Sequence, residues 1–128
     1  VSATVVLGLA GRQGWRTHID GTVALLGRAP LNYLSTLQLG LDPVVEEEFL
    51  GRFDGGFQTQ DDAGIVHELE HLIAGIDPPR PIVFRSNHAS NALPLAGNLP
   101  RDRERLLHEI VAVRTGGQGL RPQWQRGF

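Results

Sequence analysis

The 128-residue chain contains no cysteine, no methionine and no lysine. Without cysteine it can form no disulfide bond, and it cannot ligate an iron–sulfur cluster through thiolates of its own. All twelve basic residues are arginine, which we interpret as base-composition bias of the source genome and not as part of a mechanism. Because the chain starts at Val1 and lacks methionine, we expect it to be a fragment of a longer polypeptide.

Long apolar runs and a strong charge are also missing. No run approaches the roughly 20 residues of a membrane span, and no N-terminal stretch has the pattern of a signal peptide. We therefore expect a cytoplasmic location and no membrane partner. The net charge of −2 argues against a nucleic-acid partner, because such proteins usually carry a basic patch.

Hydrophobic periodicity predicts alternating strands and helices. Strands are expected over 2–9, 31–39 and 81–86, and helices over 13–27, 44–53, 61–74 and 101–113. Asp61 is expected to cap the helix over 61–74. The chain is then a single domain over 1–128 or the C-terminal portion of a larger barrel, with a βαβα unit over 1–54, an αβα unit over 55–115 and a tail over 116–128.

This βαβ(α)αβα order predicts an α/β fold with parallel strands joined by right-handed crossovers. Three parallel strands cannot close a barrel, so we expect a partial parallel (β/α) barrel. The missing strands would come from the rest of the polypeptide or from another molecule, and a homo-oligomer could form through the exposed sheet edges.

The strand over 31–39 has two unlike faces, because side chains alternate along a strand. Tyr33 and Leu37 lie on one face, and Thr36 and Gln38 lie on the other. If helices cover the Tyr33 face, Thr36 and Gln38 point into a lumen. There they would belong either to a polar network or to a ligand site.

Polar side chains crowd the carboxyl end of the strand over 81–86, which is where α/β proteins bind their ligands. The set comprises Arg85, Ser86, Asn87, His88 and Asn91. Asn and Ser also build turns and caps without a ligand, and His88 could equally stabilise the loop. The guanidinium of Arg85 requires an anionic or carbonyl partner.

His67-Glu68-Leu69-Glu70-His71 matches the His-Glu-x-x-His motif of zinc hydrolases, with His67 and His71 as metal ligands and Glu68 as the base. However, the apolar residues of this helix form a continuous stripe, and both histidines fall on the opposite face. We therefore expect a solvated helix face, with a zinc hydrolase as the weaker alternative.

Gly8 and Gly11 close a tight turn after the first strand. The turn lacks the lysine of a P-loop and the Gly-x-Gly-x-x-Gly of a dinucleotide site. What it offers is backbone that a ligand can approach closely.

Six segments together resemble the C-terminal part of radical S-adenosylmethionine proteins. Four are Ser-Ala-Thr-Val-Val-Leu-Gly-Leu-Ala-Gly (2–11), His-Ile-Asp-Gly-Thr (18–22), Tyr-Leu-Ser-Thr-Leu-Gln-Leu (33–39) and Phe-Arg-Ser-Asn-His-Ala-Ser-Asn (84–91). The others are Leu-Pro-Arg-Asp-Arg (99–103) and Arg-Pro-Gln-Trp-Gln-Arg-Gly-Phe (121–128). The resemblance covers nearly the whole chain, and Arg-Ser-Asn-His-Ala-Ser-Asn is its most specific part.

The resemblance implies a partial (β/α)₆ barrel, of which residues 2–9 and 31–39 are the fifth and sixth strands. In that family a [4Fe–4S] cluster on a Cys-x₃-Cys-x₂-Cys loop reductively cleaves S-adenosylmethionine to a radical that abstracts hydrogen from a small-molecule substrate. Gly8, Gly11, Thr36 and Gln38 would then help to hold the cosubstrate, and the polar residues from Arg85 to Asn91 would form a substrate-side loop. Without cysteine this chain cannot carry the cluster, and it has Ala10 where a further glycine is expected.

Three interpretations therefore stay open. The chain is either inert alone and part of a radical enzyme, or a non-catalytic α/β binding or oligomerisation module. The zinc hydrolase through His67, Glu68 and His71 is the third.

Overall fold

The computed structural model describes residues 2–39, 58, 60–86 and 93–116. Within them, four strands form one sheet in the order β1-β2-β3-β4. The strands are β1 (Ser2–Leu7), β2 (Tyr33–Gln38), β3 (Ile82–Arg85) and β4 (Ala96–Leu99). The helices are α1 (Gly11–Leu26), α3 (Asp62–Gly75) and α4 (Arg103–Gly116). The prediction of an α/β fold is confirmed.

The first three strands are parallel, as the sequence predicts. Leu7 of β1 lies beside Gln38 of β2, and Ser35 of β2 lies beside Arg85 of β3. The carboxyl ends of the three strands therefore meet at one edge of the sheet, which we call the carboxyl edge.

Strand β4 is a correction to the predicted topology. It runs antiparallel to β3, with Leu99 beside Ile82 and Ala96 beside Arg85, so the sheet is mixed and not purely parallel. The sequence missed this strand because Ala-Gly-Asn-Leu has neither a β-branched residue nor the length of a typical strand. Its pairing with β3 is a tertiary contact that local propensity does not encode.

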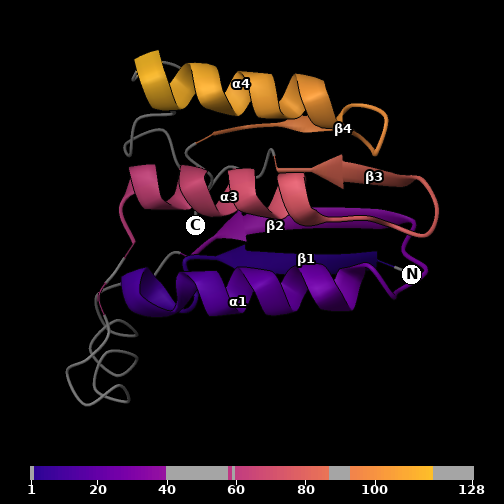
Figure 1. Cartoon of the computed structure of the whole chain (residues 1–128), viewed down its shortest axis with the longest axis horizontal. Coiled ribbons are helices and arrows are strands. Elements are labelled where there is room, and N and C mark those ends of the chain that lie inside the picture. Colours follow the sequence, from indigo (N-terminus) through magenta and orange to yellow (C-terminus); the bar gives the residue numbers. More distant parts are fainter. Residues whose placement is uncertain (1, 40–57, 59, 87–92, 117–128) are drawn as a thin grey trace.

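All three helices cover the same face of the sheet (Figure 1). Helix α3 packs between α1 and α4, and its N-cap is Asp61, whose Oδ1 accepts a hydrogen bond from the Gly64 N–H at 2.7 Å, as predicted. The core lies between these helices and the sheet. It comprises Val5, Leu7 and Leu34 with Phe84, Leu99 and the apolar stripe of α3.

The orientation assumed for β2 is therefore wrong. The helices cover the face that carries Leu34 and Thr36, which are both fully buried, while Tyr33 is exposed. On the opposite face, Thr4 and Ser35 of neighbouring strands join their hydroxyls at 3.0 Å. We call this the open face, since no described helix packs on it. Besides Thr4 and Ser35 it carries Val6, Tyr33, Leu37, Val83, Arg85 and Asn98.

Several predicted features lie outside the described residues. They are the helix over 44–53, the loop residues Asn87, His88 and Asn91, and the tail beyond position 116. Among the described helices, none is long and apolar enough to cross a membrane.

Candidate functional site at the carboxyl edge

The Gly8–Gly11 turn follows β1 at the carboxyl edge. Gly8 and Gly11 have φ angles of 84° and 69°, in the left-handed region that favours glycine. The Gly11 N–H donates to the Gly8 carbonyl at 3.0 Å, and the turn leads directly into the first residue of α1. A Cβ atom on Gly8 would lie 2.9 Å from Cδ1 of Ile65, so the backbone here is packed closely against α3.

Glu68 reaches this turn from α3. Its side chain is fully buried, and its Oε1 accepts a hydrogen bond from the Gly8 N–H at 3.0 Å. The other carboxyl oxygen accepts a hydrogen bond from Nε2 of Gln60 at 2.8 Å. Both oxygens of a buried acid are thus used inside the protein, one of them on the backbone of the turn.

The end of β2 joins the turn at the carboxyl edge. The Leu39 N–H donates to the Leu7 carbonyl at 2.9 Å, which extends the pairing of β1 and β2 beyond their last residues. Nε2 of Gln38 lies 3.4 Å from Oδ1 of Asp62, at the start of α3. Gln38 therefore lies at the boundary between the sheet and the helix layer, and its side chain is half-buried.

Thr36 and Ser86 connect β2 to the end of β3. Oγ1 of Thr36 donates to Oγ of Ser86 at 2.6 Å, and both residues are buried to about 1% exposure. The backbone of Ser86 pairs with Leu95 in both directions, at 2.7 and 3.2 Å. This pair lies on the helix-covered face. Thr36 therefore contacts the end of β3 within the core and does not face a lumen.

Arg85 lies on the open face and is half-buried. Its Nη1 donates to its neighbour's carbonyl, that of Phe84, at 2.9 Å and to the Gly97 carbonyl at 3.4 Å. The expectation of an anionic or carbonyl partner is met by carbonyls. These contacts hold the guanidinium over the β3–β4 pair.

The two histidines of His67-Glu68-x-x-His71 face α1. Both rings contact Trp15 edge-on, with centroids at 5.0 Å for His67 and 5.6 Å for His71. Nε2 of His71 also lies 2.8 Å from Oδ1 of Asp20, and this hydrogen bond is the main reason that the pKa of Asp20 is held below its ordinary value.

This arrangement does not favour zinc hydrolysis. Glu68 points away from the histidines into the core, where Gly8 and Gln60 occupy its oxygens. In the described part of the chain no three His, Cys, Asp or Glu side chains are grouped so that they could hold a metal ion. The histidines lie opposite the apolar stripe, as predicted, but the contact with Trp15 was not foreseen. His71 is only 30% exposed, less than a fully solvated face would be.

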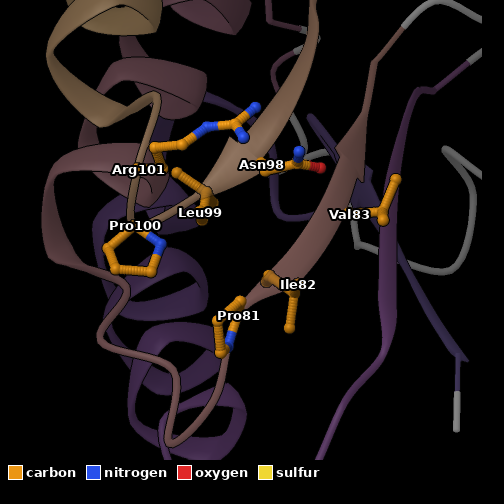
Figure 2. A pocket seen from close by; sticks show the side chains of 7 residues that line it. All are labelled: Pro81, Ile82, Val83, Asn98, Leu99, Pro100 and Arg101. Carbon is orange, nitrogen blue, oxygen red and sulfur yellow. The ribbon is translucent and has the colours of Figure 1, made fainter.

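A separate cavity of about 550 Å³ opens at the other end of the β3–β4 pair. Figure 2 shows its lining, which comes from the start of β3, the end of β4 and the turn that follows: Pro81, Ile82, Val83, Asn98, Leu99, Pro100 and Arg101. The lining is mostly apolar, and the Arg101 guanidinium is paired with Asp102 at 3.2 Å. None of the predicted site residues lies here.

The outer edge of β4 is occupied by the start of α4. The Asn98 N–H donates to Oδ2 of Asp102 at 2.8 Å, and the Asp102 N–H donates to the Asn98 carbonyl at 2.7 Å. Nη2 of Arg105 donates to the Ala96 carbonyl at 2.8 Å. These backbone groups of β4 are therefore in use, and among the described residues β4 is the last strand on this side of the sheet.

Comparisons with family models, with curated proteins and with solved structures found no match to this chain.

Gly8, Gly11, Gln38 and Ser86 were predicted from the sequence as candidate site residues, and all four lie at the carboxyl edge. The sequence did not predict the hydrogen bonds by which Glu68 contacts Gly8 and Gln60 contacts Glu68. One signal was available: on the helical wheel of α3, Glu68 falls at the border of the apolar stripe, next to Leu72.

Proposed function

We propose that this chain is the C-terminal part of a radical S-adenosylmethionine enzyme and that its carboxyl edge forms one side of the cosubstrate site. The observation that carries the proposal is the meeting of three segments far apart in sequence: the Gly8–Gly11 turn, Gln38 and Ser86. Sequence resemblance singled out these segments, and parallel pairing brings their strand ends together.

The shape of the sheet supports a partial barrel. In a (β/α) barrel, helices lie outside and the inner face of the sheet is free of them. The present sheet has all its described helices on one face, and the open face carries polar groups such as Thr4, Ser35 and Arg85. We therefore propose that the open face lines the barrel interior.

The two sheet edges support the same proposal. At the outer edge of β4, Asp102 and Arg105 are hydrogen-bonded to backbone groups of the strand. At the opposite edge, β1 pairs only with β2 in the described part of the chain, and its sequence Ser-Ala-Thr-Val-Val-Leu carries no charge and no proline to discourage pairing. The remaining barrel strands, from the same polypeptide, would add to β1.

The residues of the carboxyl edge fit a close approach by S-adenosylmethionine. The Gly8–Gly11 turn lies at this edge, and Leu9, between its two buried glycines, is exposed there. Gln38 supplies an amide at the same edge, and the buried Thr36 contributes by fixing Ser86. The [4Fe–4S] cluster, which supplies the electron for cleavage of the cosubstrate, would be held by cysteines elsewhere in the polypeptide. The expected cytoplasmic location and the small-molecule substrate belong to the same proposal.

The test is a titration of the ¹⁵N-labelled chain with S-adenosylmethionine, followed by amide chemical shifts. We expect shifts that saturate in the millimolar range and are centred on Gly8, Gly11 and Gln38. Gln38→Ala should weaken the binding, while Asn98→Ala, at the other end of the sheet, should leave it unchanged. Absence of shifts, or shifts centred on Asn98 and Arg101, would contradict the proposal.

A second candidate is a non-catalytic module that oligomerises through β1. The uncharged edge of this strand favours it, because such edges readily pair with another chain. Sedimentation velocity over a range of concentrations separates the two. A second copy on β1 predicts a dimer, whereas a monomer at high concentration argues against this candidate.

A further inference from the structure

Glu68 is a buried acid. In a zinc hydrolase it would be the base, but here its oxygens are bonded to Gly8 and Gln60. It is 0% exposed, it lies on α3 among apolar side chains, and one of its oxygens accepts the Gly8 N–H at 3.0 Å. Burying a carboxyl group inside a core is costly unless its oxygens are hydrogen-bonded. Here the acid has two such bonds, to Gly8 and to Gln60.

We infer that Glu68 is the positioning residue of the Gly8–Gly11 turn, and that it holds the turn in the conformation that receives the cosubstrate. The inference rests on the proposed function, and it adds a residue from a helix in which sequence resemblance marked nothing.

The geometry of the turn explains why it needs a partner. Gly8 has a φ of 84°, and its own carbonyl already accepts the Gly11 N–H. The Gly8 N–H is directed away from the turn into the buried space below it, where an unpaired donor would be unfavourable. Oε1 of Glu68 accepts this N–H, and the hydrogen bond fixes the orientation of the peptide plane between Leu7 and Gly8.

Gln60 fixes Glu68 in turn. Its Nε2 donates to Oε2 of Glu68 at 2.8 Å. The amide of Gln60 packs on Gly64, where an added Cβ would lie only 2.0 Å from Oε1 of Gln60. The absence of a side chain at Gly64 thus makes room for the Gln60 amide, which holds the second carboxyl oxygen of Glu68 while the first accepts the Gly8 N–H.

Three variants separate positioning from general stability. Glu68→Ala removes the acceptor of the Gly8 N–H. Glu68→Gln keeps an oxygen for Gly8, and a rotated Gln60 amide can accept from the new NH₂ group, so this variant should rescue the turn. Glu70→Ala is the matched control, because Glu70 lies two residues along the same helix and pairs with Arg114 at 3.1 Å, away from the turn.

The first readout uses the chain without ligand. In Glu68→Ala we expect the Gly8 amide to exchange its hydrogen about tenfold faster or more, and its proton resonance to move upfield. Both values should remain near those of the wild type in Glu68→Gln and in Glu70→Ala. Unchanged exchange and shift of the Gly8 amide in folded Glu68→Ala would overturn the inference.

The second readout is the S-adenosylmethionine titration. We expect Glu68→Ala to weaken binding at least about tenfold and Glu68→Gln to retain it within a few-fold. If the wild type fails to bind, the proposed function fails, while the Gly8 amide still decides whether Glu68 holds the turn. If the wild type binds and Glu68→Ala binds equally well, the positioning role is wrong and the proposed function stands.

If Glu68→Ala does not fold, Glu68→Gln combined with Gln60→Ala supplies the same comparison. This double variant keeps an acceptor but removes the residue that orients it, so the exchange of the Gly8 amide should rise. Wild-type exchange in a folded double variant would contradict the positioning role.

Discussion

Thr36 and Ser86, fifty residues apart in sequence, share a buried hydrogen bond of 2.6 Å between their hydroxyl groups. The bond joins β2 to the residue that follows β3, directly below the carboxyl edge. It gives the edge a buried polar contact beside apolar core residues such as Leu34 and Phe84.

A double-mutant cycle on this pair tests its contribution to stability. Thr36→Val and Ser86→Ala should each lower the free energy of unfolding by about 1–2 kcal/mol. Each substitution removes one of the two hydroxyl groups, and the remaining buried hydroxyl loses this hydrogen bond. The double variant should cost less than the sum, with a coupling energy of about 1 kcal/mol. Urea unfolding provides the values, and strict additivity would contradict a direct bond.

Gly8 and Gly21 provide a matched pair for the backbone of the turn. Gly8→Ala should destabilise the protein by about 1–3 kcal/mol, since φ is positive and the new Cβ would press on Ile65. Gly21 lies inside α1, and a Cβ there meets nothing within 4 Å. Gly21→Ala should therefore stabilise by about 0.5–1 kcal/mol. Equal effects of the two substitutions, measured by thermal unfolding, would show that the turn conformation is not enforced.

Trp15 is expected to organise the histidine face of α3. Trp15→Ala should lower stability by about 1–3 kcal/mol, because it removes a half-buried ring that packs edge-on with His67 and His71. It should also shift the ring proton resonances of both histidines, as the ring current of the indole is lost. Trp15→Phe keeps an aromatic ring and should reduce both effects. Unmoved histidine resonances in Trp15→Ala would contradict the packing of α1 on α3.

Asp102 should make stability depend on pH at the acid end. Its pKa lies below the ordinary value, mainly because the Arg101 side chain donates hydrogen bonds to it, and then because the Asn98 backbone does. A lowered folded-state pKa stabilises the fold above the unfolded pKa, and this stabilisation is lost as pH falls below about 4. Asp102→Asn should flatten the fall in stability in that window, and Asp77→Asn, at an exposed position, is the control for loss of one carboxylate. An unchanged acid slope in Asp102→Asn would show that the β4 edge does not depend on this charge.

Regular elements were predictable because their signals are local. The β-branched run of β1 and the apolar stripe of α3 specify one strand and one helix without tertiary information. The Asp61 cap was found for the same reason. Strand β4 was missed, since Ala96–Leu99 becomes a strand only through its pairing with β3 and through Asp102 and Arg105 on its outer side.

The meeting of the three strand ends was predictable, and the orientation of their side chains was not. Parallel strands bring Gly8, Gln38 and Ser86 to one edge, which follows from the element order alone. Which face of β2 meets the helices depends on how the apolar residues of all four strands pack together. Leu34 and Thr36 face the helices because Val5 and Phe84, their neighbours on β1 and β3, lie in the core.

The radical S-adenosylmethionine proposal is tested most directly by sequencing the source reading frame upstream of the codon for Val1. The account predicts that the frame continues without interruption and encodes Cys-x₃-Cys-x₂-Cys, followed by strands that can add to β1. A start codon immediately before Val1 would contradict it, because the cluster loop and the strands that add to β1 could then not precede this segment, and it would not be the C-terminal part of such an enzyme.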